Sequence, residues 1–121
     1  MLGRVLNFSG VVPIAGTMTL VQQITGSRSW RIATLRIVFL PGQAGTLFVR
    51  PQARDISGAR NDIFQPDPEI TGDDWVSELH DVPFDFIPGT AIQIELRNTA
   101  ARHTRRYAIQ IVLHEIGGSI V

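Results

Sequence analysis

Histidine is the side chain best suited to bind a metal ion or to transfer protons near neutral pH. The sequence has three, His80, His103 and His114. A metal-binding jelly-roll enzyme of the cupin kind needs two histidines one residue apart on a strand, and no His-x-His occurs here. A site formed by these histidines with Glu78, Asp81 and Glu115, which are nearby in sequence, stays open as an alternative. Surface histidines are the simpler interpretation, so we expect no bound metal and no cofactor.

Other catalytic patterns are also missing. The chain has no Cys and no Gly-x-Ser-x-Gly turn, and its Gly-rich stretch at residues 41–45 lacks the Lys of a P-loop. Acidic residues could bind calcium through oxygen ligands, but their spacing does not fit an EF-hand loop. Nor does the sequence indicate the two facing acids of a glycosidase. We therefore expect a protein that is not an enzyme.

The basic residues are all of one type. Eleven Arg balance eleven acidic residues, and there is no Lys. A neutral chain is a poor candidate for nucleic-acid binding, which depends on clustered positive charge. Two explanations for the missing Lys remain open: a G+C-rich coding sequence, and the use of Arg for planar contacts at interfaces.

Charge is segregated along the sequence. Eight acidic residues lie between Asp62 and Asp85, and no Arg occurs from Asn61 to Leu96. We expect opposite patches to bind neighbouring subunits, because complementary charge speeds encounter and fixes register. The alternatives are that the patches neutralise each other within one molecule, or that the basic one touches nucleic acid. The predicted partner-binding residues are Asp62, Asp67, Glu69, Asp73 and Asp74 on the acidic side, and Arg97, Arg102, His103, Arg105 and Arg106 on the basic side.

Aromatic residues offer a further alternative. Trp30 and Trp75 stand at predicted strand starts, where an indole can cap the core with its N–H near solvent. Tyr107 falls on the inward phase of its strand. We expect all three rings to pack in the core. A carbohydrate-binding module would require at least one of them to be exposed.

Alternation of apolar and polar residues dominates the chain and predicts strands. Residues 91–97 and 107–114 are expected to pair as an antiparallel hairpin around a polar loop. The other predicted strands cover residues 5–8, 17–25, 30–40, 46–50, 75–79 and 84–87. In the strand at 30–40, Ala33, Leu35, Ile37 and Phe39 share one face, and Pro51 ends the strand at 46–50. Residues 26–29 form a turn, and residues 51–73 form one long irregular connection.

About eight strands with regular turn signals indicate a single all-β domain over residues 1–121. The predicted fold is an antiparallel two-sheet sandwich of jelly-roll type, with an immunoglobulin-like sandwich as the alternative. We identify no signal peptide and no apolar run of the 18 or so residues that cross a bilayer, and we expect no membrane partner.

One stretch resembles a known group of proteins. Residues 75–98, with their short aromatic strand, Pro88-Gly89 turn and alternating strand ending in Asn98, are followed by the strand that begins at Tyr107. This pattern resembles β-sandwich virion proteins of tailed bacteriophages, such as head-decoration (cementing) and tail-accessory proteins. The resemblance assigns no functional residues.

The resemblance implies a non-enzymatic structural subunit located in the virion and assembled in the host cytoplasm. The expected partners are further copies of the chain, forming a trimer, and a capsid or other virion protein. We also expect the C-terminal Ile120 and Val121, behind two glycines, to pack on a neighbour.

Overall fold

A computed structural model describes residues 3–24 and 28–116, and these residues form nine strands and no helix. The strands are β1 (Gly3–Val12), β2 (Thr17–Gln23), β3 (Ser29–Phe39), β4 (Leu47–Arg54), β5 (Arg60–Asp62), β6 (Ile70–Thr71), β7 (Trp75–Phe86), β8 (Ala91–Asn98) and β9 (Arg105–Ile116). The predicted turn at residues 26–29 and the predicted contact of Ile120 and Val121 lie wholly or partly outside the described residues.

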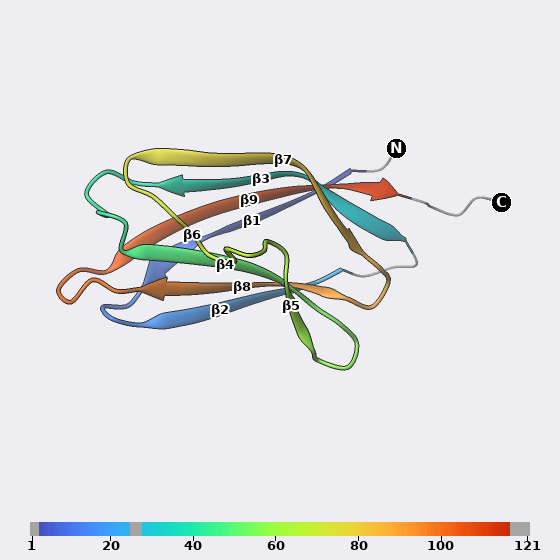
Figure 1. Cartoon of the computed structure of the whole chain (residues 1–121), viewed down its shortest axis with the longest axis horizontal. Coiled ribbons are helices and arrows are strands. Elements are labelled where there is room, and N and C mark those ends of the chain that lie inside the picture. Colours follow the sequence, from blue (N-terminus) through green and yellow to red (C-terminus); the bar gives the residue numbers. More distant parts are fainter. Residues whose placement is uncertain (1–2, 25–27, 117–121) are drawn as a thin grey trace.

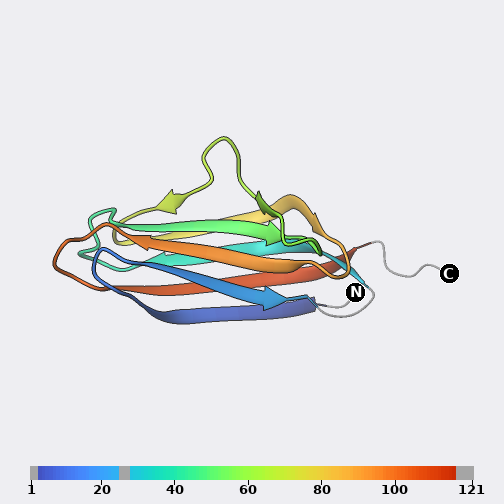
Figure 2. The ribbon, with the colours of Figure 1, turned by 90° about the horizontal axis from the view of Figure 1, so that it is seen from below.

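The strands form two antiparallel sheets packed face to face (Figure 1 and Figure 2). Sheet A has the order β1-β9-β3-β7, and sheet B has the order β2-β8-β4-β5, with the short β6 also paired to β4. The first four strands alternate between the sheets, and so do the last three, so early and late strands lie side by side in each sheet. This arrangement is a jelly roll, and it confirms the predicted fold class.

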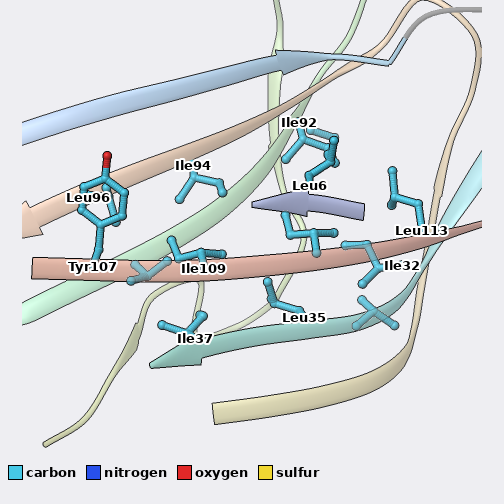
Figure 3. Close-up of a cluster of buried hydrophobic side chains, with 14 of the residues drawn as sticks. Leu6, Ile32, Leu35, Ile37, Ile92, Ile94, Leu96, Tyr107, Ile109 and Leu113 are labelled. Atoms are coloured by element: carbon cyan, nitrogen blue, oxygen red, sulfur yellow. The ribbon is translucent and has the colours of Figure 1, made fainter. Parts of the chain in front are cut away.

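The core lies between the sheets and is built from the alternate positions of each strand. Ile92, Ile94 and Leu96 of β8 point across the interior toward Ile109 and Leu113 of β9 (Figure 3). All five are at most 3% exposed. Full burial of each such side chain contributes about 1.5–3 kcal/mol relative to exposure.

The predicted hairpin of residues 91–97 and 107–114 is wrong. β8 pairs with β2 and β4 in sheet B, whereas β9 pairs with β1 and β3 in sheet A. Alternation shows that each strand has one apolar face, but it does not show whether two such faces share a sheet or face each other. Residues 99–104 are long enough to cross the roughly 10 Å between packed sheets.

The predicted end of a strand at Pro51 is also wrong. The C=O of Pro51 accepts a hydrogen bond from the N–H of Ile63 at 3.2 Å, so this residue turns its backbone polar groups away from β8. On that side β6 pairs only with Phe48 and Val49, and β5 pairs only from Gln52 onward. The missing N–H of proline therefore interrupts no ladder.

Two irregularities in strand register explain two further differences. The predicted break between residues 79 and 84 is an irregularity within one continuous strand, β7, where Asp81 has a φ of 51°. In β3 the register shifts between Ile32 and Thr34, so Ile32 and Leu35 both face the core. The prediction that Ala33 shares the inward face with Leu35, Ile37 and Phe39 is therefore wrong, because a bulge adds one residue to the strand and shifts the alternation. The stretch predicted to be irregular, 51–73, contains the end of β4 together with β5 and β6.

Candidate partner-binding surfaces

Four connections gather at one end of the sandwich, opposite the end where β1 begins and β9 ends (Figure 1). They are residues 13–16, 40–46, 72–74 and 99–104, and we call this region the loop end. Backbone hydrogen bonds join them: the N–H of Ala15 donates to the C=O of Ala100, and that of Thr99 donates to the C=O of Thr46.

Asn98 organises two of these connections. Its side chain is buried, at 2% exposure. The amide nitrogen donates to the carbonyl oxygens of Pro13 at 3.0 Å and His103 at 2.8 Å, and the side-chain oxygen accepts from the N–H of Ala100 at 2.9 Å. Asparagine suits this place because its short side chain offers donors and an acceptor to nearby backbone.

Gln43 fixes the same region from the other side. It is 3% exposed, accepts from the N–H of Leu40 at 3.2 Å and donates to the C=O of Arg106 at 2.8 Å. The Nε of Arg105 donates to the hydroxyl of Thr46 at 2.8 Å. The backbone that carries Arg102, His103, Arg105 and Arg106 is thus held at both ends, and we call these four residues the arginine tip.

Three of the predicted partner-binding residues, Asp62, Glu69 and Arg97, form ion pairs within the molecule. Arg97 binds Glu69 through two hydrogen bonds of 2.9 and 3.2 Å. Arg50 binds Asp62 in the same bidentate manner, at 2.7 and 2.8 Å, and this pairing holds the pKa of the Asp62 carboxyl below its ordinary value of 3.8. The acidic and basic sets therefore do meet inside one molecule, but only at Arg97 and Glu69.

The other seven predicted residues form no ion pair within residues 3–24 and 28–116. They are Asp67, Asp73, Asp74 and the four residues of the arginine tip. A carboxylate oxygen of Asp73 accepts from the N–H of Ala44 at 3.0 Å, which places it at the loop end. Asp74 joins it there, because its N–H donates to the C=O of Leu40. The loop end therefore carries both signs of charge.

The connection that carries Asp73 and Asp74 and the connection that carries Arg102 and His103 lie on opposite sides of the loop end (Figure 1). Residues 72–74 lead into β7 at one edge of sheet A. Residues 99–104 lie on the other side, next to the connection 13–16. Residues 40–46 lie between them, bonded to Asp73 on one side and to the backbone of Arg106 on the other.

Of the histidine–carboxylate site considered above, the described residues show one contact between a histidine and a carboxylate. His80 lies 3.2 Å from a carboxylate oxygen of Glu78 and 3.3 Å from the hydroxyl of Thr34. No group of three or more His, Cys, Asp or Glu side chains that could hold a metal ion occurs in the described part of the chain.

The aromatic residues divide into two groups. Trp30 and Tyr107 are buried, at 7% and 6% exposure, as expected, whereas Trp75 is 52% exposed. Its ring stacks on Phe39, with centroids 6.2 Å apart and planes 8° apart. Trp75 has the inward phase of β7, but it is the first residue of an edge strand and borders an open hollow. The prediction that it packs in the core is therefore only half right.

Trp75 borders a shallow hollow of about 530 Å³, which lies beside β4 and β6. Besides Trp75, its lining includes Phe48, Asp67 and Glu69. Sequence reasoning missed Phe48, Gln43 and the role of Asn98. An Asn at the end of a strand and before a polar loop is the one signal that could have indicated Asn98.

Comparison with known proteins gives a structural match only. No family model matches the sequence, and no curated protein matches it. The crystal structure of the Yersinia pseudotuberculosis-derived mitogen (YPM) matches with a TM-score of 0.59 and 12% sequence identity, over 99% of this chain and 100% of that chain. The shared feature is the β-sandwich fold. No helix within the described residues is long and apolar enough to cross a membrane.

Proposed function

We propose that this chain is a non-enzymatic assembly subunit of a tailed-phage virion, which decorates or stabilises the capsid through its loop end. The observation that carries the assembly role is the arginine tip. Its backbone is fixed by the buried Asn98 and Gln43, and its side chains form no ion pair with the described residues. A surface held in its binding conformation loses little conformational entropy on docking.

The kinds of residue at the loop end support a protein partner. Interfaces are enriched in Arg and Trp and depleted in Lys. The loop end and the strand ends next to it combine the arginine tip with Leu40 and Trp75, which are 39% and 52% exposed, and the chain has no Lys. The virion assignment rests on the resemblance of residues 75–98, together with the jelly-roll topology.

The test is made on particles. Virions purified from a host that produces this chain should contain it in a fixed copy number. The double variant Arg102→Glu, Arg106→Glu should fold but lose incorporation. Arg54→Glu is the matched control, because Arg54 is exposed at the other end of β4 and forms no ion pair with described residues. Absence of the wild-type chain from particles that form in its presence would contradict the proposal.

A carbohydrate-binding module is the second candidate, and the exposed indole of Trp75 favours it. A half-exposed aromatic ring next to the carboxylate of Asp67 could stack on a sugar ring and accept hydrogen bonds from its hydroxyls. A glycan array should then give hits that Trp75→Ala abolishes. An array without hits removes this candidate and leaves the assembly role untouched.

A further inference from the structure

The molecule already contains one complete binding site for an arginine side chain. The guanidinium carbon of Arg97 lies 4.1 Å from the centroid of the Phe48 ring. The same guanidinium donates two hydrogen bonds to the carboxylate of Glu69. An aromatic face and a carboxylate are the two groups that bind a guanidinium best, through cation–π attraction and paired hydrogen bonds. We call Phe48 and Glu69 the filled arginine site.

A second set with the same chemistry lies next to it. Trp75 and Asp67 line the same hollow as Phe48 and Glu69. Phe39 stacks on the indole of Trp75, which is nevertheless 52% exposed. Asp67 is exposed and forms no ion pair within the described ranges. We call Trp75 and Asp67, with the nearby Asp74, the open arginine site.

We propose that the open arginine site binds an arginine of the arginine tip, Arg102 or Arg106, from a second copy of this chain. This inference rests on the proposed assembly function and names one of its contacts. Complementary charge argues for this occupant: the site is acidic, and the tip is basic and has no ion pair with described residues. Trp is the aromatic ring that binds a cation most strongly.

The arrangement of the two surfaces argues for a second copy rather than for the same molecule. Within one chain, residues 40–46 lie between residues 99–104 and residues 72–74, which lead into Trp75 at the start of β7 (Figure 1). A contact between two different surfaces of identical subunits is heterologous, and its repetition closes into a ring when the rotation fits. Two complementary surfaces at different places on one chain favour such a ring, and the expected trimer is one of its closed forms.

Cysteine trapping tests the contact directly, because the chain has no Cys of its own. Arg102→Cys and Asp67→Cys chains are mixed and oxidised. We expect a disulfide-linked heterodimer in large excess over the one formed by Arg54→Cys with Asp67→Cys, whose cysteines would lie on surfaces that do not meet. Equal yields from the two mixtures would overturn the inference.

Charge reversal, with self-association measured by sedimentation, tests whether the contact depends on opposite charge. The tip variant, Arg102→Glu with Arg106→Glu, and the site variant, Asp67→Arg with Asp74→Asn, should each weaken self-association by at least about tenfold. A chain carrying all four changes should regain association, because the two reversed surfaces again have opposite charge. Asp81→Asn is the matched control for Asp74→Asn, since both are exposed Asp residues with φ near 50°.

The outcomes separate this contact from the wider proposal. A wild-type chain that stays monomeric at its highest soluble concentration, or an oligomer unchanged by both reversals, would overturn the inference. So would a glycan bound at Trp75 by a chain whose oligomer survives Trp75→Ala. Incorporation into particles is measured separately, so the assembly function can stand even if this contact fails.

Discussion

At the scale of single residues, the most demanding positions are polar and buried. Asn98 and Gln43 together satisfy backbone groups from three connections at the loop end. Buried polar groups are tolerated only when they are hydrogen-bonded. These two amides therefore act as structural supports for the arginine tip.

Asn98→Ala should destabilise the fold by about 2–4 kcal/mol, because the carbonyl oxygen of His103 and the N–H of Ala100 lose this partner and the carbonyl oxygen of Pro13 keeps only the N–H of Gly16. The urea midpoint of unfolding measures this loss. Asn7→Ala is the control, since Asn7 is exposed and its side-chain oxygen accepts a surface hydrogen bond from Gln110, and its effect should stay within about 0.5 kcal/mol. Equal effects of the two changes would contradict the role of Asn98.

The ion pair of Arg50 and Asp62 should appear in the pH dependence of stability. Its hydrogen bonds lower the pKa of Asp62 in the folded state below 3.8, so the folded form binds fewer protons than the unfolded form in acid. The stabilisation is present above the unfolded pKa and is lost as the pH falls through the folded one. Asp62→Asn should remove the loss of stability that Asp62 causes at acid pH, measured as the free energy of unfolding against pH. An unchanged dependence on pH would show that the pair contributes nothing.

At the scale of elements, strand packing depends on a few positions where a side chain would not fit. Gly10 of β1 faces the buried ring of Tyr107 on β9, and a Cβ there would lie 2.6 Å from the phenol oxygen. A side chain at residue 10 therefore requires the ring of Tyr107 to move.

Gly10→Ala should destabilise the protein by about 1–3 kcal/mol, because the ring of Tyr107 has to move within a packed core. Gly3→Ala is the matched control on the same strand, where the added Cβ would meet only the C=O of Leu113 at 3.7 Å. Thermal unfolding of both variants measures the difference. A Gly10→Ala protein as stable as Gly3→Ala would show that the ring adjusts without cost.

At the scale of the whole molecule, folding rearranges charge. The acidic run from Asp62 to Asp85 is separate from the arginines in sequence, yet Asp62, Glu69, Glu78 and Asp85 each meet an Arg from another segment. The remaining unpaired charge within the described residues includes the arginine tip and the acids beside Trp75, so a neutral chain presents both signs at its loop end.

Self-association through these charges should weaken with salt. The Debye length falls from about 10 Å at 0.1 M to about 3 Å at 1 M, which screens attraction between exposed groups. Sedimentation across this range should show a lower oligomer fraction at high salt for the wild type. The Arg102→Glu, Arg106→Glu variant should show no such decline. A salt-independent wild-type oligomer would indicate an interface that does not depend on charge.

The sequence by itself determined the all-β class, the two apolar faces of β8 and β9, and the inward phase of Tyr107, because these depend on side-chain alternation along one strand. It also indicated where opposite charges are concentrated. It did not indicate which of these charged residues form ion pairs inside the molecule.

Only the tertiary structure decided which strands share a sheet, where the two bulges fall and which arginines are used internally. These properties depend on contacts between residues far apart in sequence, such as Phe48 with Arg97 and Asn98 with Pro13. Alternation has the same period whether a strand pairs with its neighbour in sequence or crosses to the opposite sheet. The exposure of Trp75 likewise depends on how residues distant in sequence, such as Phe48, lie around it.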